Sequence, residues 1–216
     1  MKNNSFYNFI ILYYNIFIFL YNMDVNYLIG LLIMIAFSLL GYSHYEHLSQ
    51  DITYCKSDID NNEYLVRNRE DKVIAANLLA KIRIKLEKLC KLMKDKYPND
   101  TSVIRLNKRF NSNNISESGK GSQYTSYSVN KGEKIVFCIR QKDENETLVD
   151  ENTVTFVAIH ELAHIMTKSV GHTQEFWDNF KRLLKEAIND NLYTKEDYTN
   201  NPKDYCGIKV TDSPLE

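Results

Sequence analysis

Two long hydrophobic runs occupy the first 42 positions of the chain. Residues 6–21 are apolar and aromatic but include two asparagines, whereas residues 27–42 carry no charge. With Val25 and Asn26 added, the second run exceeds the minimum of about 17 residues for a membrane-spanning helix. We therefore expect a transmembrane anchor at residues 23–42. Residues 1–22 are then either a second hydrophobic helix or, if Met23 is the true start, an over-extended reading frame.

The remaining chain alternates between helical and strand-like patterns. Residues 43–70 are expected to be a linker with a hairpin at 52–67. In residues 71–96, apolar side chains recur every three or four positions, which predicts a long helix with one buried stripe. The members of this stripe are Ala75, Leu79, Ile82, Leu86, Leu89 and Met93. A short helix follows at 101–110, and the Asn-, Ser- and Gly-rich residues 111–122 predict a mobile loop. Residues 124–130 and 133–140 predict two strands joined at Lys131 and Gly132.

The stretch at 154–166 is apolar nearly all round, which predicts a buried helix, and Asp150 or Asn152 is suited to cap its start. Its few polar side chains include His160, Glu161 and His164. Histidines four positions apart lie on one face of a helix and can bind a single metal ion. Glutamate at the second position of this H-E-x-x-H motif can act as a general base on water. The motif therefore predicts a zinc site with Glu161 as the catalytic residue.

A third ligand is needed to complete such a site while leaving one position open for water. We expect it to be His172, because Gly171 can turn the chain back before a further helix at 173–189. The metzincin spacing would need glycine at 167 and histidine at 170, where this chain has threonine and valine. A gluzincin ligand in the EAIND segment, residues 186–190, is the remaining alternative.

These motifs carry a family resemblance. HELAH followed by GHTQEFW resembles the WLM family of zincin metallopeptidases, relatives of the SprT-like proteases, and the likeness extends over residues 65–216. It is strongest to short membrane-anchored WLM-like proteins of large DNA viruses. The resemblance implies His160, His164 and His172 as Zn²⁺ ligands. In zincins an edge strand above the metal helix pairs with extended substrate. By that likeness, the candidate strand is 133–140, with Glu133, Ile135, Phe137 and Ile139 as candidate substrate-binding residues.

Composition narrows the choice of partner and compartment. A net charge of −1 gives no indication of a nucleic-acid partner, although the basic face of the helix at 71–96 offers a site to DNA or anionic lipid. The four scattered cysteines form no C-x-x-C motif. Two disulfides are compatible with their number, but we expect four reduced thiols, and hence a peptidase domain on the cytosolic side of a host or virion membrane. Tyr205 is a candidate oxyanion donor, with surface packing the simpler interpretation.

The sequence thus predicts an α+β fold. A zincin-like domain at residues 71–216, with a small antiparallel sheet packed on helices, follows one or two membrane helices. The predicted activity is that of a membrane-tethered zinc metallopeptidase that hydrolyses protein or peptide substrates. Two alternatives stay open at this point. One is a protease for DNA–protein crosslinks, and the other is a non-catalytic membrane or virion structural protein that keeps a zinc fold.

Overall fold

The computed structural model describes residue 14, residues 24–49 and residues 51–215, and it divides into the units Met1–Ser49 and Gln50–Glu216. The first unit contains helix α2 (Val25–Ser49), whose segment Val25–Ser43 is long and apolar enough to cross a membrane. At 1.5 Å per residue, these residues span about 28 Å, close to the hydrocarbon thickness of about 30 Å. The first hydrophobic run, residues 6–21, lies outside the described residues except for Tyr14.

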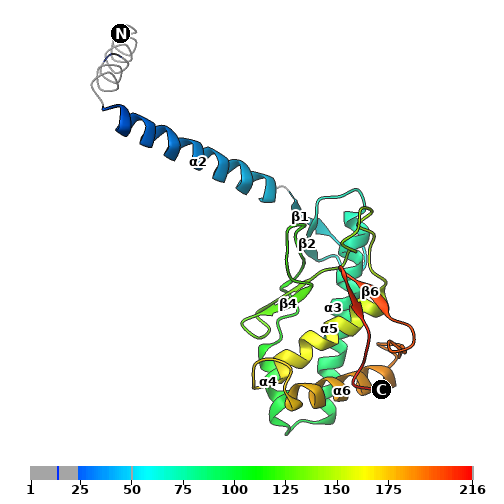
Figure 1. The fold of residues 1–216 in the computed structure, drawn as a ribbon. Coiled ribbons are helices and arrows are strands. Elements are labelled where there is room, and N and C mark those ends of the chain that lie inside the picture. Colours follow the sequence, from blue (N-terminus) through cyan, green and yellow to red (C-terminus); the bar gives the residue numbers. More distant parts are fainter. Residues whose placement is uncertain (1–13, 15–23, 50, 216) are drawn as a thin grey trace, which may run out of the picture. The chain divides into compact units, whose positions relative to one another are not determined.

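The second unit contains a five-stranded sheet in the order β1-β2-β3-β5-β4. Its strands are β1 (Ile52–Lys56), β2 (Glu63–Arg67), β3 (Ile115–Glu117), β4 (Ser126–Val129) and β5 (Lys134–Phe137). Of these strands, β1, β2 and β4 are labelled in Figure 1. Strand β3 pairs in parallel with both β2 and β5, whereas the β1–β2 and β4–β5 hairpins are antiparallel. The expected α+β class is confirmed, and the sheet is mixed rather than wholly antiparallel.

Four helices complete the core of this unit: α3 (Lys72–Lys96), α4 (Thr101–Arg109), α5 (Glu151–Met166) and α6 (Gln174–Asn189). Helix α3 packs against β2, α5, α4 and α6, so it lies at the centre of the fold. Every member of the apolar stripe predicted for it is at most 1% exposed. The periodic pattern therefore identified both this helix and its buried face.

Local capping explains where two of these helices begin. The Asp100 carboxylate accepts hydrogen bonds from the backbone N–H groups of Ser102 and Val103 at the start of α4. Asp150 does the same for Thr153 at the start of α5, at 2.9 Å. A short aspartate side chain at this position satisfies amides that have no partner within the helix. Of the two caps considered for the buried helix, Asp150 is the one used.

The segment at 111–122 differs from the expected loop, because it contains strand β3. All three residues of this strand are buried, including Ser116 and Glu117. The Glu117 carboxylate accepts 2.7 Å hydrogen bonds from the Arg67 backbone N–H and from Nε of Arg140. These long-range partners let the Glu117 carboxylate occupy the middle of the sheet, which local composition cannot reveal.

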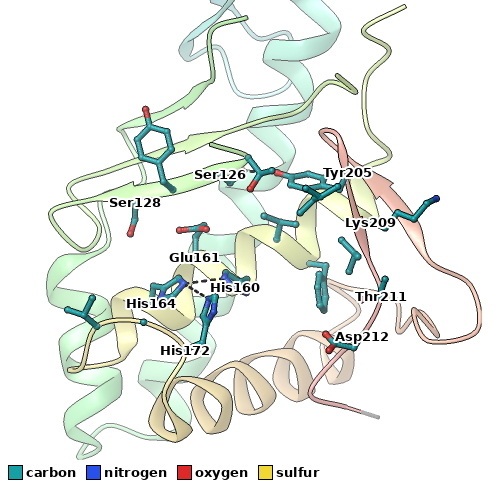
Figure 2. Close-up of a pocket in the computed structure, with 18 of the residues that line it drawn as sticks. Ser126, Ser128, His160, Glu161, His164, His172, Tyr205, Lys209, Thr211 and Asp212 are labelled. Atoms are coloured by element: carbon teal, nitrogen blue, oxygen red, sulfur yellow. Dashed lines mark hydrogen bonds between the residues drawn. The ribbon is translucent and has the colours of Figure 1, made fainter. Parts of the chain in front are cut away.

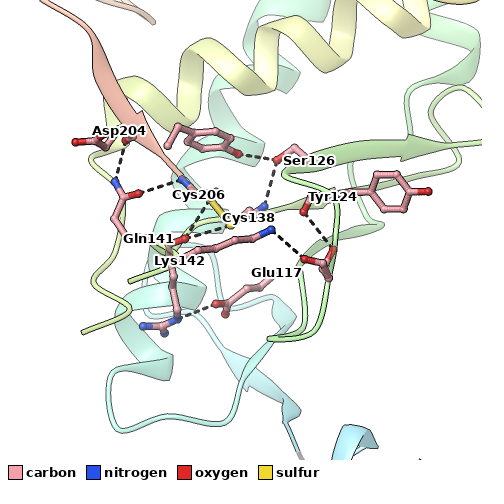
Figure 3. The surroundings of a disulfide bond; sticks show 11 residues. Glu117, Tyr124, Ser126, Cys138, Gln141, Lys142, Asp204 and Cys206 are labelled. Atoms are coloured by element: carbon pink, nitrogen blue, oxygen red, sulfur yellow. Dashed lines mark hydrogen bonds and ion pairs between the residues drawn. A yellow bond between two sulfur atoms is a disulfide. The ribbon is translucent and has the colours of Figure 1, made fainter. Parts of the chain in front are cut away.

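The C-terminal segment forms a separate hairpin of β6 (Lys203–Tyr205) and β7 (Ile208–Val210). A disulfide bond between Cys138 and Cys206 attaches it to the residue after β5 (Figure 3). Gln141 adds two hydrogen bonds, to the Asp204 carbonyl and from the Cys206 N–H. The expectation of four reduced thiols is wrong for this pair. The placement of the domain on the cytosolic side was inferred from reduced thiols, so that inference loses its basis. Cys55 and Cys90 are free and buried.

The disulfide should contribute strongly to stability, because it closes a loop with a sequence separation of 68 residues. We expect the double variant Cys138→Ser/Cys206→Ser to lose about 4 kcal/mol of unfolding free energy, from the lost restriction of the unfolded chain. Urea unfolding with and without dithiothreitol measures this effect. The reductant should destabilise the parent and leave the double variant unchanged. Equal midpoints for parent and variant under oxidising conditions would contradict a stabilising role.

Candidate functional site

Helix α5 carries the H-E-x-x-H motif on a face that opens into a cleft of about 610 Å³ (Figure 2). His160 and His164 lie one helical turn apart, and both side chains are partly buried. The rest of the helix is packed so tightly that Val154, Ala158, Leu162 and Ile165 are fully buried. The two imidazoles are therefore presented from a rigid support.

The structure brings His172 to these two histidines. The Nε2 atoms of His160 and His164 are 3.1 Å apart, and each is 3.2 Å from Nε2 of His172. Four-coordinate binding with metal–nitrogen bonds of about 2.05 Å gives nitrogen separations of about 3.3 Å, so this triangle fits a tetrahedral ion. In the described part of the chain, this is the group of three donors able to hold a metal ion.

The triangle also cannot be explained by hydrogen bonding among the histidines. A neutral imidazole nitrogen either carries a proton or presents a lone pair, and it cannot do both. One protonated Nε2 can donate to the other two, but the third contact then joins two lone pairs. A cation at the centre removes this repulsion, since all three lone pairs then point at positive charge.

Burial keeps two of these imidazoles neutral and therefore able to bind metal. The pKa of His160 is lowered to about 3, mainly by desolvation and then by the charges of the other two histidines. The pKa of His164 is lowered to about 4 by desolvation, by His172 and by Lys131. A histidine must be deprotonated to coordinate a metal, so lowered pKa values favour the binding-competent form near neutral pH.

His172 differs from the other two because it is exposed and lies on the short connection between α5 and α6. Gly171 in this connection has a φ of +83°, a left-handed conformation that glycine adopts without strain. Glu175, in the first turn of α6, accepts hydrogen bonds from the backbone N–H groups of Lys168 and Ser169. The lowered pKa of Glu175, caused first by the Lys168 bond, reflects these contacts. This carboxylate therefore orders the segment that leads to His172.

Phe176, the phenylalanine of the GHTQEFW segment, supports all three histidines. It is fully buried, and its ring centroid lies 4.9 Å from that of His160, 4.4 Å from His164 and 4.6 Å from His172. Its place four residues after His172, one turn into an amphipathic helix, was the available signal. Aromatic packing of this kind restricts imidazole rotation, which preorganises the three nitrogens.

Glu161 lies next to the histidines, beneath strand β4. Its side chain is buried, and desolvation raises its pKa to about 7, an effect partly offset by a backbone hydrogen bond from Ser128. A carboxyl group with a pKa near neutral can both accept and return a proton. The arrangement thus combines a metal-binding triangle with an adjacent group suited to proton transfer.

The edge strand beside this site is β4, not the 133–140 segment expected from the sequence. Strand β5 is paired on one side with β3 and on the other with β4, so its backbone groups are already used. Ile135, Phe137 and Ile139 are fully buried, and Glu133 lies in the turn before β5. The five-residue apolar run from Ile135 to Ile139 was the available signal, because an interior strand lacks clean alternation.

The opposite wall of the cleft comes from the β6–β7 hairpin. Tyr205 is buried rather than exposed, and its hydroxyl lies 2.6 Å from Oγ of Ser126 on β4. Desolvation raises the Tyr205 pKa, so the phenol stays protonated. Glu186, the alternative ligand, is held elsewhere by the Lys96 ammonium at 2.8 Å and the Tyr97 hydroxyl at 2.7 Å. It therefore has a structural role at the α3–α6 contact.

The aromatic support of the histidines can be tested with two buried phenylalanines of equal size. Phe176 contacts all three imidazoles, whereas Phe180 contacts the His160 ring at 5.2 Å. We expect Phe176→Leu and Phe180→Leu each to cost about 1 to 3 kcal/mol of stability, as core truncations do. Phe176→Leu should also weaken divalent-metal binding by about tenfold, as loss of ligand support does, and by more than Phe180→Leu. Chelator competition measures the affinities, and equal losses in the two variants would contradict the special role of Phe176.

The chain is similar in sequence to proteins of large DNA viruses. The chain is 30% identical over 198 residues to protein R325 of Acanthamoeba polyphaga mimivirus, covering 90% of this chain and all of that one. It is 37% identical over 82 residues to protein 136R of Invertebrate iridescent virus 6, covering 38% and 44% of the two chains.

Among solved structures, Wss1 from Saccharomyces cerevisiae aligns with a TM-score of 0.45 and 20% identity, over 59% of this chain and 88% of that one. The WLM domain model matches residues 64–214, which include the three histidines, Glu161, β4 and the β6–β7 hairpin. The chain therefore belongs to the WLM domain family.

Proposed function

We propose that this chain is a zinc metallopeptidase held at a membrane by helix α2. The observation that carries the proposal is the triangle of three imidazole nitrogens with a buried carboxyl group beside it. Three imidazole nitrogens spaced to hold one ion, on a helix face that opens into a cleft, match the donor set of catalytic zinc sites.

The chemistry follows from the positions of the protein groups. Zinc, when bound, supplies a Lewis acid that acidifies water and polarises a peptide carbonyl. Glu161 takes a proton from the attacking water and returns it to the leaving amine, for which its pKa of about 7 is suited. The zinc ion would be held by His160, His164 and His172. Packing of Phe176 against their imidazole rings restricts the rotation of those rings.

The substrate in this proposal is an extended segment of protein. Strand β4 ends the five-stranded sheet as described, and Ser126 and Ser128 line the cleft along it. An extended peptide can add to such an edge through backbone hydrogen bonds, which give affinity with little dependence on sequence. Apolar side chains of Phe156, Val157 and Val210 in the cleft favour apolar substrate residues beside the cleaved bond.

The basic face of α3 gives little support to a nucleic-acid partner. Lys81 and Lys85 both pair with Glu151, Arg83 pairs with Asp60, and Lys88 pairs with Asp190. Cationic groups already paired with carboxylates release few counterions from DNA, so they contribute little to its affinity. The surface of α3 therefore gives no specific support to the DNA–protein crosslink alternative.

A purely structural zinc site is also less consistent with the geometry. Burying a carboxyl group costs free energy unless it is compensated, and a structural site has no use for one beside its ligands. Glu161 is 5% exposed and its pKa is raised by that burial. Its retention at this position is accounted for by catalysis.

The catalytic role can be tested with the full-length chain in detergent and a Glu161→Gln partner, using unfolded casein as substrate. Both proteins should bind one zinc ion, because Glu161 is not a ligand. The substitution should lower kcat/KM by about 10² to 10⁴, the usual contribution of a general base. Zinc in both proteins without cleavage by the parent would favour the structural alternative, and absence of zinc from the parent would overturn the ligand set.

Membrane anchoring can be tested separately in a chain that begins at Met23. Met34 lies near the centre of the Val25–Ser43 segment and is 63% exposed. We expect Met34→Lys to release the protein from carbonate-washed membranes, because a lysine at that depth costs about 3 kcal/mol. Met34→Leu should remain in the membrane fraction. Retention of both variants in that fraction would contradict a spanning role for α2.

A further inference from the structure

The proposed metal site includes one ligand whose position the motif helix cannot fix. His160 and His164 both belong to α5, but His172 lies in the connection after that helix ends at Met166. Phe176 packs against its ring, but His172 is exposed and its backbone lies outside the helix. Its position therefore also depends on the contacts made by the connection itself, residues 167–173.

Lys131 makes the most extensive of these contacts. Its ammonium group donates to the carbonyl oxygens of Thr167, Lys168 and Ser169, at 3.0, 2.9 and 2.8 Å. A lysine ammonium has three hydrogens, so these three bonds use its whole donor capacity. These carbonyl groups belong to the three residues immediately after the C-terminal end of α5. A positive charge at a helix C-terminus also interacts favourably with the helix dipole.

Lys131 itself stands on a well-fixed support, the β4–β5 turn. Asn130, Lys131 and Gly132 all have positive φ, at 47°, 53° and 110°. A Cβ atom at Gly132 would lie 2.8 Å from the Arg109 carbonyl oxygen, so the turn is pressed against the end of α4. This close packing fixes the base from which the lysine side chain extends.

The connection is thus held from two sides. Lys131 binds its carbonyls, while Glu175 accepts hydrogen bonds from the N–H groups of Lys168 and Ser169 at 3.0 and 3.3 Å. Glu175 lies in the first turn of α6, directly after the connection in the sequence. Lys131 belongs to the hairpin whose first strand, β4, is the edge beside the cleft.

We propose that Lys131 is a positioning residue that holds His172 in place as the third metal ligand and links that ligand to the substrate-binding edge. The inference rests on the zinc site of the proposed function. Lys131 acts through the backbone of residues 167–169 and does not itself touch the metal. Substrate pairing with β4 would then be transmitted to the ligand through one side chain.

The direction in which metal affinity changes distinguishes a positioning role of Lys131 from a simple effect of its charge. The Lys131 charge lies close enough to His164 to disfavour a positive charge there. Removing that charge alone would strengthen cation binding, because like charges repel. Loss of positioning would weaken it, so the sign of the change separates the two roles.

The test measures Zn²⁺ affinity of the full-length chain in detergent by chelator competition. Lys131→Met should weaken zinc binding by about 10- to 100-fold, the range found when ligand-supporting residues are removed. Lys131→Arg, which keeps charge and donors, should recover part of that loss. Lys168→Met is the matched control, because it removes an exposed charge from the same connection and leaves the backbone bonds intact. It should bind zinc as the parent does.

A double-mutant cycle with His172→Ala tests whether Lys131 acts through that ligand. In the His172→Ala background, Lys131→Met should cause no further loss of zinc affinity, because only the loss of its repelling charge then remains. The Co²⁺ visible spectrum should also shift similarly in Lys131→Met and His172→Ala, since both lose the third nitrogen. Circular dichroism of each variant identifies loss of fold, and additive effects in the cycle would assign Lys131 to general stability instead.

Two outcomes overturn the inference while leaving the proposed function intact. One is parent-like or tighter zinc binding by Lys131→Met, and the other is a further loss of affinity in the His172→Ala background. If instead the parent chain itself binds no zinc, the proposed function fails first. The two failures are therefore distinguishable within one set of measurements.

Discussion

The structure depends on the close approach of three imidazole nitrogens, each within 3.2 Å of the other two. Without a cation, at least one of these contacts opposes two lone pairs, so the arrangement must be held by its surroundings. Helix α5 fixes two of the nitrogens through its buried faces. Phe176 packs against all three rings, and the α5–α6 connection brings in the third. The proposed metal site thus places three imidazoles where they repel one another unless a cation is bound.

The supports of this site come from different parts of the chain and meet around one cleft. The Cys138 N–H donates to Oγ of Ser126 at 3.1 Å, and the same oxygen lies 2.6 Å from the Tyr205 hydroxyl. Tyr205 is next to Cys206, which is bonded back to Cys138. This closed ring of contacts joins β4, β5 and the β6–β7 hairpin. It holds the two walls of the cleft together and protects the buried site of Glu161.

The third ligand of the proposed site, His172, lies on an exposed connection. Backbone segments with few buried contacts open at lower free energy than core elements do. A ligand on such a segment can be displaced without unfolding α5, whereas His160 and His164 cannot. The hydrogen bonds made by Lys131 and Glu175 counter that tendency. Lys131 extends from the turn after the edge strand β4, so its bonds connect that hairpin to the segment that carries His172.

Local patterns in the sequence determined much of the secondary structure and which side chains share a helix face. The three- and four-residue periodicity fixed α3 and its buried stripe, the turn at Asn130–Gly132 fixed the β4–β5 hairpin, and the H-E-x-x-H spacing fixed which side chains share a face of α5. These features depend on neighbours within a few positions. The tertiary structure decided the strand order, the place of polar β3, the Cys138–Cys206 pairing and the contacts of Lys131. Each of these joins residues from about 20 to nearly 70 positions apart, and such pairings depend on packing and hydrogen-bond satisfaction across the whole fold rather than on local propensity.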